Sequence, residues 1–380
     1  MRNEENSQLP TAHSPLPTQT TDNNSAPCRH FGVCGGCRTQ DIPYDVQLCD
    51  KRTALRDLLQ PVLTEGLLQS LEVSPSPVLW EYRNRMEFTF SMRDERLLLG
   101  LHQRGKYWEI VDLEECLLCP QAFMTVVHET RRFASESGLP AYDKTHHTGF
   151  WRYLLVRGTR SSGRVLAEIM TAQEDARAIE GLSDHLRNTY PQLSGLFWSH
   201  VPGVGDAPIA VRTEHLFGEP FILETLAGLE VPIGPRTFLQ PNTATAEILY
   251  SDLSAALDLQ GEEKVLDLYC GVGMIGALLA RWSGEVVGVE REALNVEMGR
   301  ELIRRNSLSN FRIIESNVVT LQENPGECSQ ADVIVVDPPR AGLNKKVLKY
   351  LHSCHPCRIA YIYCNPKALK DNLRRFDRLG

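Results

Sequence analysis

The carboxyl-terminal part of the chain alternates between two apolar periodicities, and this alternation constrains the fold more than any other feature. Apolar residues at helical spacing end near residue 257 and resume at residues 275 and 293. Short strand-like runs separate them, at 264–268, 285–289, 312–315, 332–336 and 359–363. Strands that alternate with helices form a parallel sheet with helices on both faces. We therefore expect a doubly wound α/β fold.

A glycine-rich turn follows the first of these strands, in Asp267-Leu-Tyr-Cys-Gly-Val-Gly-Met-Ile-Gly276. Its glycines allow a tight turn and close backbone approach to a ligand, at the sheet edge where such folds bind nucleotides. Glu290 ends the next strand about 20 residues further on, where a carboxylate can accept hydrogen bonds from ribose hydroxyls. An ordinary tight turn is the alternative, but Asp337 at a later strand end argues against it. No Lys-Ser or Lys-Thr pair follows the loop, which disfavours a nucleoside triphosphate.

Cys364 stands where the last strand-like run should give way to a loop, a position from which active-site side chains project. Asn365-Pro366 stops that strand, and Pro338-Pro339 does the same beside Asp337. We therefore expect the two strand ends to face one pocket. A buried small hydrophobe is the alternative, because free cysteines are commonly buried.

Three cysteines near the amino terminus, Cys28, Cys34 and Cys37, lie in one short glycine-containing segment. Three thiolates in such a loop can wrap an inorganic cluster, with a fourth ligand supplied from elsewhere. Zinc is the main alternative, since four thiolates also suit it, and unligated thiols are the other. The chain has 11 cysteines, an odd number, which fits a reducing compartment better than a disulfide framework.

The remaining segments predict how the chain divides. Residues 1–27 are rich in Ser, Thr, Asn, Gln and Pro, so we expect a disordered tail, followed by a cysteine loop at 28–50. Helical spacing covers 46–68. Residues 51–240 are predicted to form an α+β middle domain, and residues 241–380 the catalytic domain. The strands expected in the middle domain are 86–91, 97–102, 153–157, 165–170 and 196–199, with helices near 121–137 and 172–188.

The net charge and the hydropathy of the chain limit the classes of partner that we expect. The net charge of −8 argues against a surface coated with basic residues, although a local basic cleft is compatible with it. No run of about 18 apolar residues and no signal-peptide pattern occurs, so we expect no membrane contact and a cytoplasmic location. Basic candidates for phosphate contacts are Tyr82-Arg-Asn-Arg85, Arg152, Arg157 and Arg160, with Phe88, Phe90 and Trp151 nearby for stacking. A solvated basic face is the alternative for each.

Four separated motifs resemble the RNA uracil-5-methyltransferases: Phe238-Leu-Gln-Pro-Asn242, residues 267–273, Asp337-Pro-Pro-Arg340 and Cys364-Asn-Pro366. The resemblance covers residues 28–380 and implies a class I S-adenosylmethionine (SAM)-dependent fold with Cys364 as the nucleophile. The cofactor-binding positions that it implies are Gln240, Tyr269, Met274, Glu290, Asn317 and Asp337. Met274 stands where relatives often carry a polar residue.

The amino-terminal cysteines resemble the iron–sulfur branch of that family, which acts on 23S ribosomal RNA. The resemblance implies a 4Fe-4S cluster on Cys28, Cys34 and Cys37 with Cys116 as the fourth ligand, and Cys119 is a local rival for that place. It also implies ribosomal RNA as the partner of a monomeric enzyme that makes 5-methyluridine through a covalent cysteine adduct. The cysteines speak against the alternative, a transfer RNA uracil-5-methyltransferase.

One part of the family pattern has no match in this sequence. Relatives carry a glutamate in a carboxyl-terminal segment, after a further pair of strands, and it serves as the base that removes the carbon 5 proton. The resemblance therefore implies either a truncated sequence or a defective relative that stalls at the covalent adduct. A noncatalytic RNA-binding protein is the alternative from a different functional class.

Overall fold

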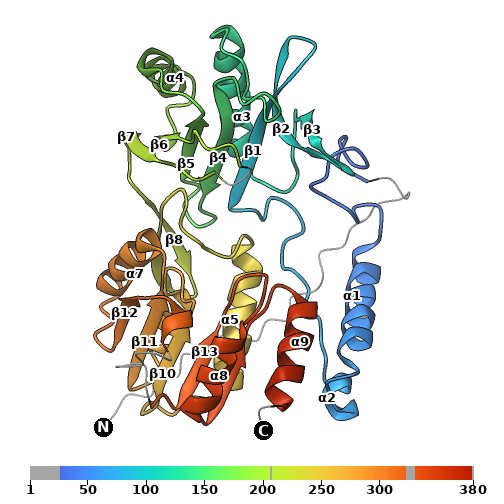
Figure 1. The fold of residues 1–380 in the computed structure, drawn as a ribbon, viewed down its shortest axis with the longest axis vertical. Helices are drawn as coiled ribbons and strands as arrows, with labels where there is room; N and C mark the ends of the chain where they lie inside the picture. Colours follow the sequence, from blue (N-terminus) through green and yellow to red (C-terminus); the bar gives the residue numbers. More distant parts are fainter. Residues whose placement is uncertain (1–25, 206–207, 322–329, 379–380) are drawn as a thin grey trace.

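The computed structural model describes residues 26–205, 208–321 and 330–378, and the tail predicted for 1–27 falls almost wholly outside them. Two sheets form two lobes, one above the other along the long axis (Figure 1). Among the helices of the described residues, none has both the length and the apolar character that crossing a membrane requires.

The lower lobe in Figure 1 is built on a five-stranded sheet in the order β12-β11-β10-β13-β14, in which every neighbouring pair is parallel. Its strands are β10 (Lys264–Leu268), β11 (Glu285–Glu290), β12 (Phe311–Glu315), β13 (Val333–Val336) and β14 (Arg358–Tyr361). The strand order reverses between β10 and β13, and ligands of such sheets bind at the carboxyl edge of that point.

Helices cover both faces of this sheet because side chains along each strand alternate between two hydrophobic cores. Val333 and Val335 of β13 belong to the core that includes residues of α5 (Thr243–Leu257), α6 (Met274–Leu279) and α7 (Ala293–Arg305). Ile334 and Val336 belong to the other core, with residues of α8 (Lys345–Cys354) and the short helix η1 (Val318–Thr320). The predicted doubly wound arrangement is confirmed.

The upper lobe in Figure 1 is a seven-stranded sheet in the order β3-β2-β1-β4-β5-β6-β7. Its strands are β1 (Arg85–Arg93), β2 (Arg96–Gln103), β3 (Lys106–Asp112), β4 (Trp151–Gly158), β5 (Val165–Thr171), β6 (Leu193–His200) and β7 (Arg212–Gly218). Helices α3 (Gln121–Glu136) and α4 (Ala176–Thr189) pack on it. The strands β5 and β6 are parallel because α4 connects them as a crossover, and β3 and β7 were not predicted.

The single helix predicted over 46–68 is wrong. The structure has two helices there, α1 (Tyr44–Leu59) and α2 (Glu65–Gln69). Pro61 lies in the break, where it has no N–H to donate and its ring opposes a continuous helix. Leu59 and Leu68 pack with Leu369 of α9 (Pro366–Asp377), so the amino-terminal helices rest against the last helix of the described chain (Figure 1).

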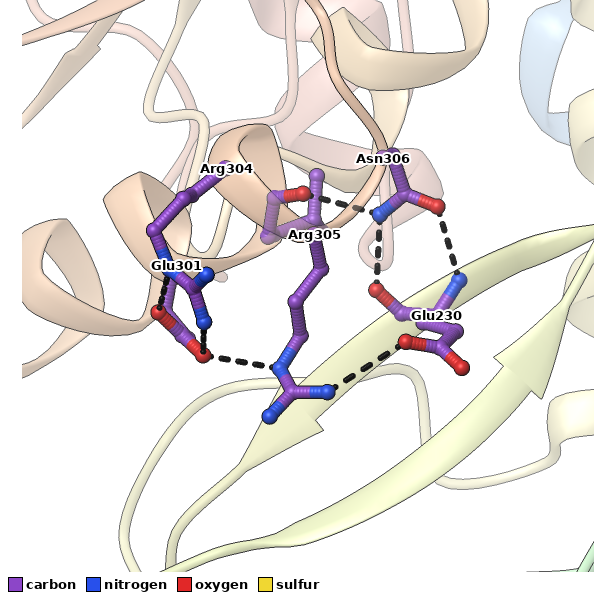
Figure 2. A network of polar contacts seen from close by, with 6 residues as sticks. Glu230, Glu301, Arg304, Arg305 and Asn306 are labelled. Atoms are coloured by element: carbon purple, nitrogen blue, oxygen red, sulfur yellow. Dashed lines mark hydrogen bonds and ion pairs between the residues drawn. The ribbon is translucent and has the colours of Figure 1, made fainter.

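A two-stranded hairpin of β8 (Ile222–Leu226) and β9 (Leu229–Ile233) leads from the upper lobe into the lower one. A polar network holds it against α7 (Figure 2). The Asn306 side chain donates to the Glu230 carbonyl at 2.8 Å and accepts from the Glu230 N–H at 3.0 Å. Arg305 bridges Glu301 and Glu230, at 2.8 and 3.3 Å. These contacts fix the start of the segment that continues to Gln240 and α5.

Candidate active site

Two carboxylates flank the central strand at the carboxyl edge of the parallel sheet. Glu290 is the last residue of β11 and Asp337 directly follows β13, while β10 lies between these two strands. Leu268 at the end of β10 pairs with Val289 on one side and Val336 on the other. The register therefore brings Glu290 and Asp337 to the two sides of the turn that Tyr269 begins.

Backbone N–H groups hold the Glu290 carboxylate in place. Gly271 donates to Glu290 Oε2 at 2.9 Å, and the N–H groups of Arg291 and Glu292 each donate to Oε1 at 2.8 Å. Tyr269 adopts φ of +62°, a left-handed conformation that is uncommon for a non-glycine residue and clusters at functional sites. The turn and the acidic residue are thus one preorganised unit.

Asp267 lies beneath this turn and is fully buried. Its Oδ2 accepts from the Gly276 N–H at 2.9 Å, but its Oδ1 has no hydrogen-bond partner among the described residues. Burial, together with the nearby negative charges of Asp337 and Glu290, raises the pKa of Asp267 to about 8. A buried acceptor without a partner is costly, so this edge gains stability when a ligand or solvent supplies a donor.

Gln240, which lies just before α5, meets Asp337 at the carboxyl edge of the parallel sheet. The Gln240 side chain donates to Asp337 Oδ2 at 3.4 Å. Asn84, just before β1, donates through its side chain to the Gln240 carbonyl at 2.8 Å and through its N–H to the Pro241 carbonyl at 2.9 Å. Burial raises the pKa of Asp337 to about 6. Asn84 was predicted only as part of a phosphate-contacting segment. No sequence signal indicated that it holds the backbone of residues 240–241, which we call the Gln240 strap.

Met274 and Asn317 are placed differently from the other predicted cofactor residues. Met274 begins α6, and its side chain is 3% exposed and packs in the hydrophobic core. Its thioether is also only a weak acceptor, so a side-chain hydrogen bond to a cofactor has no support there. Asn317 is exposed after β12, and its Oδ1 already accepts from the Val319 N–H at 3.0 Å.

Cys364 is exposed, so the alternative of a buried hydrophobe is wrong for this thiol. Strand β14 ends at Tyr361, earlier than the predicted residue 363, and Cys364 lies in the loop that Asn365 closes as the N-cap of α9. The Asn365 side chain donates to the Arg340 carbonyl at 3.0 Å. Both loops border one pocket, whose roughly 150 Å³ of empty space includes open solvent; its lining includes Pro338, Pro339, Arg340, Tyr361, Tyr363 and Cys364. The two strand ends face one pocket, as predicted.

The four cysteines predicted as cluster ligands line one cavity of about 330 Å³, part of it open to solvent: Cys28, Cys34, Cys37 and Cys116. Leu101, Leu113 and Phe31 complete an apolar wall. Cys119 is not among the lining residues, and its thiol instead points to the Cys116 carbonyl at 3.7 Å. The cavity therefore favours Cys116 over its rival.

The thiols of this cavity influence one another electrostatically. Burial raises the pKa of Cys28, Cys34 and Cys37, and the neighbouring Cys116 sulfur raises each further. Yet among the described residues no three His, Cys, Asp or Glu side chains converge closely enough to hold one metal ion. A single zinc ion requires such convergence. The four cysteines therefore share one cavity without forming a metal-binding group among the described residues.

The predicted aromatic contacts to RNA are wrong. Phe88, Phe90 and Trp151 are 0, 2 and 0% exposed, because they lie on strands packed beneath α3. Arg152 is also buried, and its guanidinium donates to the Val201, Gly203 and Gly205 carbonyls. Arg157 is buried and donates to the Thr237 carbonyl. These side chains organise the upper sheet, whereas Arg160 is exposed.

A doubly wound sheet with this turn and these carboxylates is the fold of a SAM-dependent methyltransferase. The solved tRNA (uracil-54, C5)-methyltransferase of Pyrococcus abyssi, in complex with S-adenosyl-L-homocysteine, is similar to this chain with a TM-score of 0.73. The match covers 90% of this chain and 78% of that chain at 27% identity.

Sequence relatives identify the family. The model of the family described as tRNA (Uracil-5-)-methyltransferase matches residues 234–379. An RNA methyltransferase of Caldanaerobacter subterraneus subsp. tengcongensis is 34% identical over 360 residues, 92% of this chain and 78% of the relative. The tRNA (uracil(54)-C(5))-methyltransferase of Pyrococcus furiosus is 29% identical over 93% of this chain and 79% of its own. The chain belongs to the RNA uracil-5-methyltransferase family.

Proposed function

We propose that this enzyme methylates carbon 5 of one specific uridine in 23S ribosomal RNA, in the cytoplasm and as a monomer. The observation that carries the chemistry is the exposed Cys364 thiol in a pocket shared with the Asp337-Pro-Pro-Arg340 loop. A nucleophile at the carboxyl edge of a cofactor-binding sheet is placed to attack a base that enters the pocket. Such a base must first leave its stack, at a cost of a few kcal/mol.

The reaction follows from the weakness of carbon 5 as a nucleophile. Cys364 adds as a thiolate to carbon 6 of uracil, forming a C–S bond and moving the ring double bond into an enolate that activates carbon 5. SAM supplies the electrophilic methyl group. A base then removes the carbon 5 proton, the electron pair re-forms the double bond, and the thiolate leaves carbon 6.

The carboxyl edge of the parallel sheet carries hydrogen-bond donors and acceptors that match those of SAM. We assign Glu290, fixed by three backbone N–H groups, to the ribose hydroxyls. Gln240 and Asp337 together offer an amide and a carboxylate at the same edge, next to Tyr269. Asn317 supplies a polar side chain at the end of β12, and Met274 contributes through its backbone.

The thiols of Cys28, Cys34, Cys37 and Cys116 are the proposed ligands of a 4Fe-4S cluster. Three of them come from the amino-terminal loop and one from the segment after β3, so the cluster ties both to the upper sheet. We assign this cluster a structural role, because it would hold these two segments together beside the apolar wall of Leu101 and Leu113.

Transfer RNA is the second candidate substrate, and the comparisons favour it specifically. The Pyrococcus furiosus relative and the solved Pyrococcus abyssi structure are both named as enzymes that methylate uracil 54 of tRNA. The proposal for 23S ribosomal RNA rests instead on the cysteine cavity and on the iron–sulfur branch that its cysteines resemble.

A single assay separates these candidates. The purified protein is incubated with labelled SAM and either undermodified 23S ribosomal RNA or undermodified tRNA, and free product is resolved from RNA crosslinked to protein. Free 5-methyluridine in ribosomal RNA alone supports the proposal, and product in tRNA alone replaces it with the second candidate. Methylated RNA that remains on Cys364 means that no base in the chain removes the proton. If neither free product nor crosslinked RNA is found with either substrate, the result favours a noncatalytic RNA-binding protein.

A further inference from the structure

Two adjacent aromatic side chains on β3 stand out on the surface of the upper lobe. Tyr107 is 72% exposed and Trp108 is 65% exposed, more than Phe238 at 53% and Trp282 at 52%. Their rings meet edge to face, with centroids 5.2 Å apart and an interplanar angle of 82°. Large apolar rings left in water forgo the free energy of burial, so a paired and exposed set indicates a contact surface.

A break in the strand ladder explains how two neighbours come together. Successive side chains of a regular strand point to opposite faces of the sheet. Here His102 of β2 pairs with Ile110, but the next residue, Gln103, pairs with Lys106. Residues 107–109 therefore bulge out of the ladder between these pairs. Bulges re-aim side chains, and this one frees Tyr107 and Trp108 from alternation.

The turn beside the bulge contacts the cysteine loop. Gly35 donates to the His102 carbonyl at 2.9 Å, and Arg104 donates to the Val33 carbonyl at 2.8 Å. Since β3 is the edge strand of its sheet, nothing in the sheet lies beyond the two rings. The loop that carries Cys34 thus contacts the turn end of the hairpin that presents the two rings.

The charges beside the rings are suited to a polyanion. The exposed turn before Tyr107 carries Arg104 and Lys106. Lys106 is 3.0 Å from Glu109, a surface pair that is worth little, while no carboxylate among the described residues lies within ion-pair distance of Arg104. Aromatic faces next to an unpaired guanidinium match the two features of single-stranded RNA, bases to stack and phosphates to neutralise.

We propose that Tyr107 and Trp108 form a stacking surface for unpaired bases of the RNA substrate, away from the Cys364 pocket. This inference rests on the proposed function only in taking RNA as the substrate class. The two rings stack on bases without sequence specificity, since every base has a π-face. Arg104 adds a phosphate contact.

The test measures the affinity of the full chain for a fluorescein-labelled, mixed-sequence single-stranded oligoribonucleotide by anisotropy. The double variant Tyr107→Ala/Trp108→Ala should bind at least about fivefold more weakly, because stacking is lost. Trp282→Ala is the matched control, since Trp282 is also an exposed tryptophan but lies on the parallel-sheet lobe. It should leave the affinity unchanged, and Trp108→Phe should retain most of it.

Two further readouts keep the inference separate from misfolding and from the proposed function. The double variant should keep its SAM affinity and its salt dependence of RNA binding, whereas Arg104→Ala should reduce the salt slope by about one. The inference would be overturned if the double variant still binds SAM and binds RNA as tightly as the wild type does. The two rings would then be left as a contact surface for another protein. Loss of affinity supports it even where the assay detects no 5-methyluridine.

Discussion

The side chain of Asn84 donates a hydrogen bond of 2.8 Å to the backbone carbonyl of Gln240. The two residues belong to different lobes, and all seven strands of the upper sheet lie between them in the sequence. Asn84 is 5% exposed and also donates to Thr243 Oγ1 at 3.2 Å, at the start of α5. The upper lobe therefore sets the position of the strap that brings Gln240 to Asp337.

Replacing Asn84 with Ala should weaken SAM binding about 2- to 12-fold, the worth of one net hydrogen bond. The strap would lose the contact that holds Gln240 beside Asp337. Isothermal titration with SAM measures the change. Asn306→Ala is the matched control, because it removes a similar side-chain contact to a backbone carbonyl, at Glu230, away from the cofactor edge. Equal affinities in the two variants would refute a positioning role for Asn84.

Replacing Cys364 with Ala should abolish methylation, with a loss of at least about 10³-fold, because the proposed mechanism assigns the covalent step to this thiol. SAM affinity should change little, since Cys364 lies on the loop after β14 and not at the turn that Tyr269 begins. Product formation is followed with labelled SAM and binding by titration. Cys357→Ala, which removes another exposed thiol, should keep full activity. Activity in the Cys364 variant would end the proposed mechanism.

The stability of the cofactor-free protein should fall as the pH rises from about 4 to about 8. Asp267 has a folded-state pKa of about 8, against about 3.9 in an unfolded chain. Between these values the native state keeps a proton that the unfolded state has released, so the free energy of unfolding falls by up to about 1.4 kcal/mol per pH unit. Asp337, with a pKa of about 6, acts in the same direction over the lower half of the range.

Urea unfolding at several pH values tests this with Asp267→Asn. The amide oxygen can still accept from the Gly276 N–H, but the group no longer titrates, so the decline should flatten. Asp371→Asn removes an exposed carboxylate of α9 and should keep the wild-type slope. Parallel pH profiles for wild type and Asp267→Asn would contradict the buried charge as the cause.

Replacing Cys34 with Ser should remove the visible absorbance and most of the iron from protein purified without oxygen. Cys34 is the most buried of the proposed ligands, and its loop contacts β2 through Gly35. Loss of the cluster should also lower the thermal midpoint, since the apolar wall of the cavity becomes wetted. Cys49→Ser, an exposed thiol outside the cavity, is the control. Iron content equal to wild type in the Cys34 variant would exclude it as a ligand.

Much of the parallel sheet could be predicted because its signals are local. Strand β10 has its predicted bounds, and the ends of β13 and β14 differ by one or two residues. The turn at Asp267 and the Asn365-Pro366 stop depend on residue types that force a backbone conformation wherever they occur. Cys364 and Asp337 could be nominated for the same reason, since strand ends of a parallel sheet share one edge.

The upper lobe was harder to predict, because burial there depends on distant elements. Phe88 and Trp151 have the residue types of a stacking surface, but α3 covers them. Tyr107 and Trp108 have no helix above them and lie on a bulged edge strand that was not predicted at all. Aromatic type alone cannot separate these cases, since the hydrophobic effect acts on whatever surface the final packing removes from water.

The sequence by itself determined the order of strands and helices in the lower lobe, the glycine turn and the place of Cys364, the proposed nucleophile, after the last strand. Each follows from backbone preferences or side-chain chemistry within a few residues. Only the tertiary structure decided that Asn84 holds the Gln240 strap, that Cys116 rather than Cys119 lines the cysteine cavity, and that Tyr107 and Trp108 face solvent. Those outcomes depend on contacts between segments far apart in the chain, which local preferences do not encode.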